Sequence, residues 1–231
     1  MLMNIAIIVA GGIGSRLGYE KPKQFVLVNG KPILAYTIDV FNQSSSLDEI
    51  VIVSHPDYIQ NVKEIVNQFS FNKVKNIVPG GDTRQLSVFN GLEAINAKDD
   101  DIVLIHDAAR PMIKDDLIRQ SIELCKKENA VTLAKKVSDT TVSSDDGYFD
   151  ELLDREKLYQ IQTPQTFKYH VIKEAHQKAL SEGIKNASDD AQLVKKYFGK
   201  VHILENPNLN IKITTKDDLQ LFEIMLNKKD Q

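Results

Sequence analysis

Short apolar runs alternate along the chain with longer segments in which apolar residues recur at helical spacing. The short runs predict strands at residues 5–9, 50–53, 74–78, 102–105, 130–134 and 201–204. The longer segments predict helices at residues 32–41, 58–69, 83–95, 115–128, 171–180, 189–197 and 216–226. Strands separated by helices of this length indicate a three-layer, Rossmann-like α/β fold around a mostly parallel sheet.

Residues 137–159 break this alternation. Short Thr/Val stretches flank the sequence Ser-Ser-Asp-Asp-Gly, which is typical of a hairpin turn rather than of a crossover helix. An isolated two-stranded ribbon is marginally stable in water, so we expect this β-arm to pack against another surface, such as a second subunit. We therefore expect one domain over residues 1–231, with a protruding β-arm at about 137–159 for which dimerisation is one use.

The composition is ordinary for a globular protein, with 42% hydrophobic and 26% charged residues. Its 29 basic and 32 acidic residues give a net charge of −3, so the overall field does not attract nucleic acid or an anionic membrane. The single cysteine, Cys125, excludes an internal disulfide and a multi-cysteine metal site, and it fits a reducing compartment. Because no apolar stretch approaches the about 18 residues of a membrane span and no signal sequence is evident, we expect a cytoplasmic protein.

A glycine-rich loop with basic residues, VAGGIGSRLGYEKPKQF at residues 9–25, follows the first predicted strand. At the carboxyl edge of an α/β sheet, glycines let backbone N–H groups approach the phosphate oxygens of a ligand. The dinucleotide pattern G-x-G-x-x-G fails because Leu17 stands where the third glycine belongs, and the Walker pattern is absent. The loop therefore predicts an anion site with a cationic pair, Arg16 and Lys23; a tight turn with solvated charges is the alternative.

Two further segments are predicted to reach the same edge of the sheet. Gly-Gly-Asp with a nearby arginine and serine opens the helix after the third strand, and it adds backbone donors and short polar groups. Asp107 directly follows the fourth strand, where a single carboxylate can bind a Mg²⁺ ion whose other ligands are water and phosphate. A helix cap or a salt bridge to Arg110 would explain Asp107 equally well.

Six segments together resemble a known family. The sequences AGGIGSRLG…PKQF, GGDTRQLSVFNGL, HDAARP, QTPQTF, SDDAQLV and NIKIT occur in the order found in methylerythritol-phosphate and ribitol-5-phosphate cytidylyltransferases, over about residues 5–219. The resemblance implies transfer of a cytidylyl group from CTP to a small polyol phosphate, with release of pyrophosphate. It also implies a requirement for Mg²⁺ and a homodimer.

Matching the family's motifs residue by residue assigns roles to positions of this chain. Arg16 and Lys23 match the catalytic cationic pair at the triphosphate, and Asp107 matches the Mg²⁺ ligand. The positions that match nucleotide-binding residues are Val9, Ala10, Gly11, Gly12, Gly14, Ser15, Gly81, Asp82, Arg84 and Ser87. The positions that match acceptor-binding residues are Arg155, Lys212, Arg110 and Thr140, the last two with a partner subunit as the expected source.

The attacking group in such a reaction is already an anionic phosphate, so no side chain has to act as a general base. Fixed cations and a metal ion supply most of the catalysis in transfers of this kind. We therefore expect the five histidines to be structural or on the surface, with His106 orienting the loop that carries Asp107. Cys125 is expected to be buried, and residues 98–101 are expected to form a solvated loop.

The acceptor is the least determined part of the hypothesis. Thr141 and Val142 resemble the ribitol-phosphate members, and Tyr159 stands where isoprenoid members often have Trp, whereas GGDTRQLSVFNGL, HDAARP and SDDA are closer to the isoprenoid members. We favour 2-C-methyl-D-erythritol 4-phosphate, a precursor of isoprenoids, and keep D-ribitol 5-phosphate, the precursor of CDP-ribitol for cell-envelope polymers, as the alternative. A protein that binds CTP without catalysis is the alternative of another class.

Overall fold

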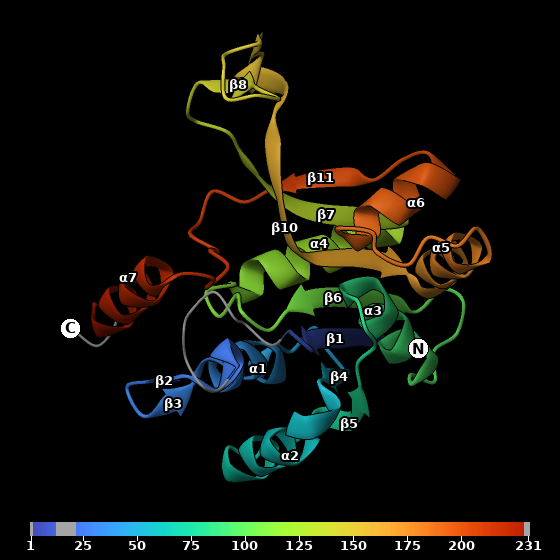
Figure 1. Cartoon of the computed structure of the whole chain (residues 1–231). Coiled ribbons are helices and arrows are strands. Elements are labelled where there is room, and N and C mark those ends of the chain that lie inside the picture. Colours follow the sequence, from blue (N-terminus) through green and yellow to red (C-terminus); the bar gives the residue numbers. More distant parts are fainter. Residues whose placement is uncertain (1, 13–21, 229–231) are drawn as a thin grey trace.

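The computed structural model describes residues 2–12 and 22–228, which form a seven-stranded sheet flanked by helices (Figure 1). The strands lie in the order β11-β7-β10-β6-β1-β4-β5. Their bounds are β1 Asn4–Ala10, β4 Glu49–Ser54, β5 Val74–Pro79, β6 Ile102–Asp107, β7 Ala130–Lys136, β10 Tyr159–Lys168 and β11 His202–Glu205. Strand β10 is antiparallel to both of its neighbours and every other pair is parallel, so the prediction of a mostly parallel sheet is confirmed.

Helices cover both faces of the sheet. Their bounds are α1 Ile33–Gln43, α2 Ile59–Gln68, α3 Arg84–Glu93, α4 Asp115–Glu128, α5 Tyr169–Ser181, α6 Asp190–Phe198 and α7 Lys216–Asn227. Helices α1, α2 and α4 pack on one face and α3, α5 and α6 on the other, which gives the three predicted layers. Helix α7 packs through Phe222 on the small hairpin of β2 (Leu27–Val28) and β3 (Lys31–Pro32). Within the described ranges, no helix has the length and apolar character needed to cross a bilayer.

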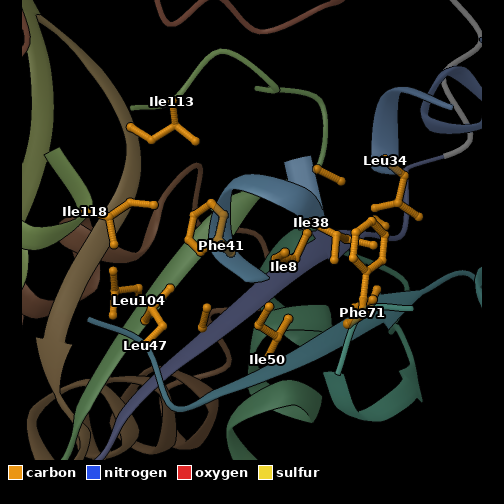
Figure 2. Close-up of a cluster of buried hydrophobic side chains, with 14 of the residues drawn as sticks. Ile8, Leu34, Ile38, Phe41, Leu47, Ile50, Phe71, Leu104, Ile113 and Ile118 are labelled. Carbon is orange, nitrogen blue, oxygen red and sulfur yellow. The ribbon is translucent and has the colours of Figure 1, made fainter. Parts of the chain in front are cut away.

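The first strand shows why its sequence is apolar at every position from Ile5 to Ala10. Ile5 and Ile7 point into the core under α3 and α5, whereas Ala6 and Ile8 point into the core under α1 and α4. Figure 2 shows Ile8 packed in the second of these layers with Phe41 of α1 and Leu104 of β6. A strand buried on both faces reads as a continuous apolar run, which is the signal that made β1 predictable.

Strand β10 was not predicted, because its sequence YQIQTPQTFK is polar and contains an internal proline. Its polar side chains are nevertheless buried, and they are bonded to neighbours that are distant in sequence: Gln165 Nε2 donates to Thr132 Oγ1 over 3.1 Å, and Thr166 Oγ1 donates to Ser121 Oγ over 3.0 Å. The ladder to β7 shifts register between residues 161 and 165, next to the proline. Buried polar strands of this kind depend on tertiary partners that no local pattern reveals.

The expectation of a solvated loop at residues 98–101 is wrong for Asp101. Its side chain is buried, where Oδ1 accepts a hydrogen bond from the backbone N–H of Met3 and Oδ2 one from that of Lys98, each over 2.8 Å. Asp99 and Asp100 are exposed, as expected. Asp101 therefore ties the start of β6 to the N-terminal segment.

A hairpin lies within the range that was predicted for the arm. Strands β8 (Thr141–Ser143) and β9 (Glu151–Leu153) pair in antiparallel fashion and project from the sheet at the top of Figure 1. The hairpin exposes Tyr148, Phe149 and Leu152 by 77%, 67% and 61%. Large apolar side chains exposed to this extent on a two-stranded ribbon are typical of a contact surface.

Candidate active site

A cavity of about 360 Å³ lies at the carboxyl ends of β1 and β6, which are neighbouring parallel strands with Val9 opposite Asp107. The predicted residues that line it are Val9, Ala10, Gly11, Gly12, Lys23, Gly81, Asp82, Arg84, Ser87, Asp107 and Lys212. The lining residues that were not predicted are Gln24, Thr83, Ala108, Ala109 and Thr214. The predicted residues Gly14, Ser15 and Arg16 lie outside the described residues. The fold thus brings segments from both ends of the chain to one hollow.

The loop before α3 is held close to that helix, which explains its glycines. A Cβ on Gly81 would lie 2.6 Å from Leu86 Cβ, so any larger residue would push the loop away. The N–H of Gly81 donates to Ser87 Oγ over 3.1 Å, and the Ser87 hydroxyl donates to the carbonyl of Thr83 over 2.9 Å. Ser87, which was predicted to bind the nucleotide, therefore fixes the loop that faces the cavity.

Gln24 is a site residue that the sequence did not indicate. It is buried, and its Nε2 donates to the carbonyl oxygens of Ala10 and Gly12 over 2.7 and 3.0 Å. These two bonds hold the backbone at the start of the glycine-rich loop, where Gly11 and Gly12 line the cavity. Gln24 follows Lys23 directly, so its two bonds also tie the backbone next to Lys23 to the end of β1.

Asp107 is the centre of a cluster of three basic side chains. Its Oδ2 lies 2.8 Å from Lys212 Nζ and 3.5 Å from Arg110 Nε, and its Oδ1 lies 3.3 Å from Arg84 Nε. Burial raises the pKa of Asp107, but the charges of Arg84, Lys212 and Arg110 outweigh burial and hold the pKa well below its usual range. The salt bridge to Arg110 considered from the sequence is present, and the carboxylate is ionised.

Lys212 reaches this cluster because its neighbour in sequence is anchored. The N–H of the fully buried Ile213 donates to the carbonyl of Ala109 over 2.8 Å, two residues beyond Asp107. The segment before α7 thereby lies against the loop that follows β6. This explains how a lysine more than a hundred positions from Asp107 becomes its ion-pair partner.

Arg84 is held from the other side by a second carboxylate. Its Nη1 lies 2.7 Å from Asp190 Oδ2, and Asp190 Oδ1 lies 3.0 Å from His176 Nε2. Burial lowers the pKa of Arg84, but the two nearby carboxylates, Asp190 and then Asp107, raise it overall, so the guanidinium is permanently charged. His176 is buried and serves this ion pair, as expected for a structural histidine.

His106 orients the Asp107 loop, as expected. Its Nε2 lies 3.1 Å from the carbonyl of Arg110, and its Nδ1 lies 3.1 Å from Thr163 Oγ1, which also accepts the N–H of Asp107 over 3.1 Å. Burial lowers the pKa of His106 to about 4. We therefore assign a neutral ring whose Nε2–H donates to Arg110 and whose Nδ1 accepts from the Thr163 hydroxyl.

A smaller cavity of about 160 Å³ adjoins the larger one, since both are lined by Arg84, Asp107 and Lys212. The remaining residues that line it are Arg110, Ile161, Gln162, Thr163, Gln165, Ser188 and Asp189. Arg110 thus lies at the site of its own chain, although a partner was expected to supply it. The space combines a cationic region with polar groups suited to hydroxyls.

Two predicted acceptor-binding residues are not brought to these cavities by a single chain. Thr140 is exposed next to β8, and Arg155 is exposed in the arm. The Nη1 of Arg155 donates to the carbonyl of Ser138 over 3.1 Å, and its Nε lies 3.9 Å from Glu156. Neither residue lines either cavity.

The chain resembles known proteins over nearly its whole length. The sequence model of the family described as IspD, 2-C-methyl-D-erythritol 4-phosphate cytidylyltransferase, matches residues 4–228. A 2-C-methyl-D-erythritol 4-phosphate cytidylyltransferase from Clostridium acetobutylicum is 46% identical over 228 residues, which cover 98% of each chain. A ribitol-5-phosphate cytidylyltransferase from Streptococcus agalactiae serotype V is 37% identical over 99% of this chain and 97% of its own.

A solved structure supports the same relationship. The 4-diphosphocytidyl-2C-methyl-D-erythritol synthase from Anaerococcus prevotii superposes with a TM-score of 0.84 at 33% identity, and the match covers 98% of this chain and 96% of the other. Family match, sequence identity and fold therefore agree over the residues that build both cavities. The chain belongs to the 2-C-methyl-D-erythritol 4-phosphate cytidylyltransferase family, whose members are nucleotidyltransferases.

Proposed function

We propose that the protein transfers the cytidylyl group of CTP to 2-C-methyl-D-erythritol 4-phosphate, a step of isoprenoid precursor synthesis, and releases pyrophosphate. The observation that carries this proposal is the pair of adjoining cavities that share Arg84, Asp107 and Lys212. The larger cavity has glycine backbone around it and suits the nucleotide. The smaller one suits a short phosphorylated polyol.

The reaction needs little covalent help from the protein. An oxygen of the acceptor's phosphate attacks the α-phosphorus of CTP, the bond from that phosphorus to the oxygen bridging to the β-phosphate breaks, and pyrophosphate leaves. Lys23 at the larger cavity, together with Arg16, would stabilise the negative charge that builds up on the phosphoryl oxygens. Because the attacking phosphate is already anionic, no side chain has to take up a proton.

Arg110 and Lys212 suit the acceptor's phosphate. Both line the smaller cavity, where three basic side chains face one carboxylate at Asp107 and one at Asp190 behind Arg84. The guanidinium of Arg110 and the ammonium of Lys212 would pair directly with the oxygens of an anionic phosphate. Lys212 lines both cavities and would contact the acceptor's phosphate beside the phosphates of CTP.

The donor set at the cavities fits a magnesium ion. Asp107 is an ionised carboxylate that lines both spaces, and no cluster of three or more His, Cys, Asp or Glu side chains suited to a metal occurs in the described part of the chain. Mg²⁺ commonly takes one or two carboxylates and completes its coordination with water and substrate phosphates. We propose that Asp107 holds Mg²⁺ in this way, and that the ion neutralises part of the triphosphate's charge.

The arm is the proposed contact of a homodimer. Its exposed apolar side chains, including Tyr148 and Leu152, would be covered by a second copy of the chain. Thr140 and Arg155 lie at the base of the same arm, so dimerisation would bring them to the acceptor site of the partner. A cytoplasmic location, where CTP is available, completes the proposal.

D-Ribitol 5-phosphate is the second candidate acceptor, because the relative from Streptococcus agalactiae is named for it and is 37% identical. The test is pyrophosphate release with CTP, Mg²⁺ and each polyol phosphate in turn. We expect the higher kcat/KM with 2-C-methyl-D-erythritol 4-phosphate. A higher kcat/KM with ribitol 5-phosphate would reassign the acceptor, and CTP binding without pyrophosphate release from either mixture would make the protein a nucleotide-binding protein only.

A further inference from the structure

Gln162 lines the smaller cavity and is 7% exposed, but no role follows for it from the family's motifs. It lies on β10 directly before Thr163, the residue that bonds both His106 and the Asp107 loop. We propose that Gln162 determines acceptor specificity by donating a hydrogen bond from its amide nitrogen to a hydroxyl oxygen of the polyol. This inference rests on the proposed function and names one recognition group within it.

The orientation of the Gln162 amide is fixed by backbone groups. The N–H of Asn208 donates to Asn206 Oδ1 over 2.8 Å, and because a backbone N–H can only donate, this atom must be the oxygen of that amide. The other branch of Asn206 is therefore the nitrogen, and it donates to Gln162 Oε1 over 2.9 Å. The Gln162 oxygen is thus assigned to the side that faces Asn206, a residue that lines neither cavity.

A second chain of bonds gives the same answer independently. Asn210 Nδ2 donates to the carbonyl of Thr163 over 2.9 Å, and a carbonyl can only accept. The same nitrogen lies 3.2 Å from Gln162 Oε1, so this atom again must be the acceptor. With Oε1 engaged by two asparagines, the NH₂ group is the part of Gln162 that remains for a ligand.

The other residues of the cavity indicate which part of the acceptor Gln162 meets. Arg84, Arg110 and Lys212 attract the phosphate, which leaves Gln162, together with Ser188 and Asp189 of the same lining, for the polyol. A hydroxyl both accepts and donates, so a cavity that offers an amide NH₂, a carboxylate and a serine hydroxyl matches its chemistry. A site that is built to pair a substrate hydroxyl discriminates strongly against molecules that lack it.

Gln162→Met tests the inference, because methionine keeps the length of the side chain and removes the donor. We expect kcat/KM for the polyol phosphate to fall about tenfold, as for loss of one well-aligned hydrogen bond, while the KM for CTP stays within about twofold. Ser121→Ala is the matched control. It removes the hydrogen-bond partner of Thr166, which is buried on β10 like Gln162 but lines neither cavity. The control is expected to lower stability and to leave both KM values unchanged.

Asn206→Asp tests the orientation itself. The new carboxylate would repel Gln162 Oε1 and attract its NH₂ group, which turns the donor away from the cavity. We expect a weaker acceptor kcat/KM in the wild-type background and no further loss in the Gln162→Met background. This variant decides the matter if Gln162→Met does not fold.

The outcomes separate the inference from the function on which it rests. An active wild type whose acceptor kcat/KM survives Gln162→Met or Asn206→Asp overturns the role of Gln162 and leaves the proposed function standing. An equal loss toward CTP and acceptor makes the residue structural and also overturns its role. A wild type that is inactive with both polyol phosphates overturns the proposed function instead.

Discussion

Replacing Asp107 with asparagine should destabilise the ligand-free protein, although it removes a charge from a candidate active site. The carboxylate is 10% exposed and has three basic partners, Arg110, Arg84 and Lys212, at 12%, 22% and 41% exposure. Loss of one partner from a buried ion pair costs about 3–5 kcal/mol. The cost here should be lower, because Arg84 keeps Asp190 and the largely exposed Lys212 can turn into water.

The loss of unfolding free energy therefore depends mainly on Arg110. Without the Asp107 carboxylate, the Arg110 side chain keeps the bond from its Nη1 to the carbonyl of Asn210, over 2.8 Å. We expect Asp107→Asn to lose about 2 kcal/mol of unfolding free energy, which for a chain of this size lowers Tm by roughly 4–8 °C. Asp57→Asn, at a position 79% exposed, is the control and should shift Tm by no more than about 1–2 °C.

The assay is thermal unfolding followed by circular dichroism in EDTA, with and without pyrophosphate. Pyrophosphate should raise the Tm of Asp107→Asn more than that of the wild type, because its charge compensates the basic residues and no carboxylate repels it. Adding Mg²⁺ should reverse this order if Asp107 holds the ion. A ligand-free variant as stable as the wild type, or more stable, would refute the reasoning about the cluster.

Three further predictions concern other parts of the molecule. Because burial lowers the pKa of His106 from 6.5 to about 4, the unfolded chain takes up this proton first as the pH falls, so the histidine should contribute a loss of about 3 kcal/mol of stability between these pH values. Urea unfolding measured as a function of pH would show this loss of stability, and His106→Gln should flatten the dependence of unfolding free energy on pH. A variant with the same pH dependence as the wild type would contradict the assignment to His106. Burial raises the pKa of the Cys125 thiol to about 12, so it should resist DTNB in the native protein at pH 8 and react once in urea, and rapid native labelling would contradict this. Leu152→Asp on the arm should convert a dimer into a monomer in sedimentation velocity, and a wild type that sediments as a monomer would exclude the proposed contact.

Much of the fold was predictable from local pattern because the central strands are buried on both faces. Ile5 and Ile7 serve one core and Ala6 and Ile8 the other, so the apolar run itself indicates the strand. Strand β10 has no such apolar run, because its buried glutamines and threonines form hydrogen bonds to residues far away in sequence. Asp101 was misjudged for the same reason, since its partner Met3 lies 98 residues away.

The site was predictable as a set of segments but not as a geometry. The motifs indicated Asp107, Arg84 and Lys212 one by one; parallel strands with shared carboxyl ends explain why Asp107 and Arg84 meet, and the bond from Ile213 to Ala109 brings Lys212 to them. Nothing local showed that these charges would pair with one another, or that Gln24 would bind the carbonyls of the glycine-rich loop. Such contacts depend on the packing of distant segments.

The measurement that tests the account most directly is the turnover number of Lys23→Ala with CTP, Mg²⁺ and the preferred polyol phosphate. Lys63, on the solvent side of α2, provides the matched control Lys63→Ala. If the larger cavity positions fixed charge around the triphosphate, kcat of Lys23→Ala falls by at least ~100-fold while its Tm and far-UV spectrum match those of the control. A turnover number near that of the wild type would contradict the account.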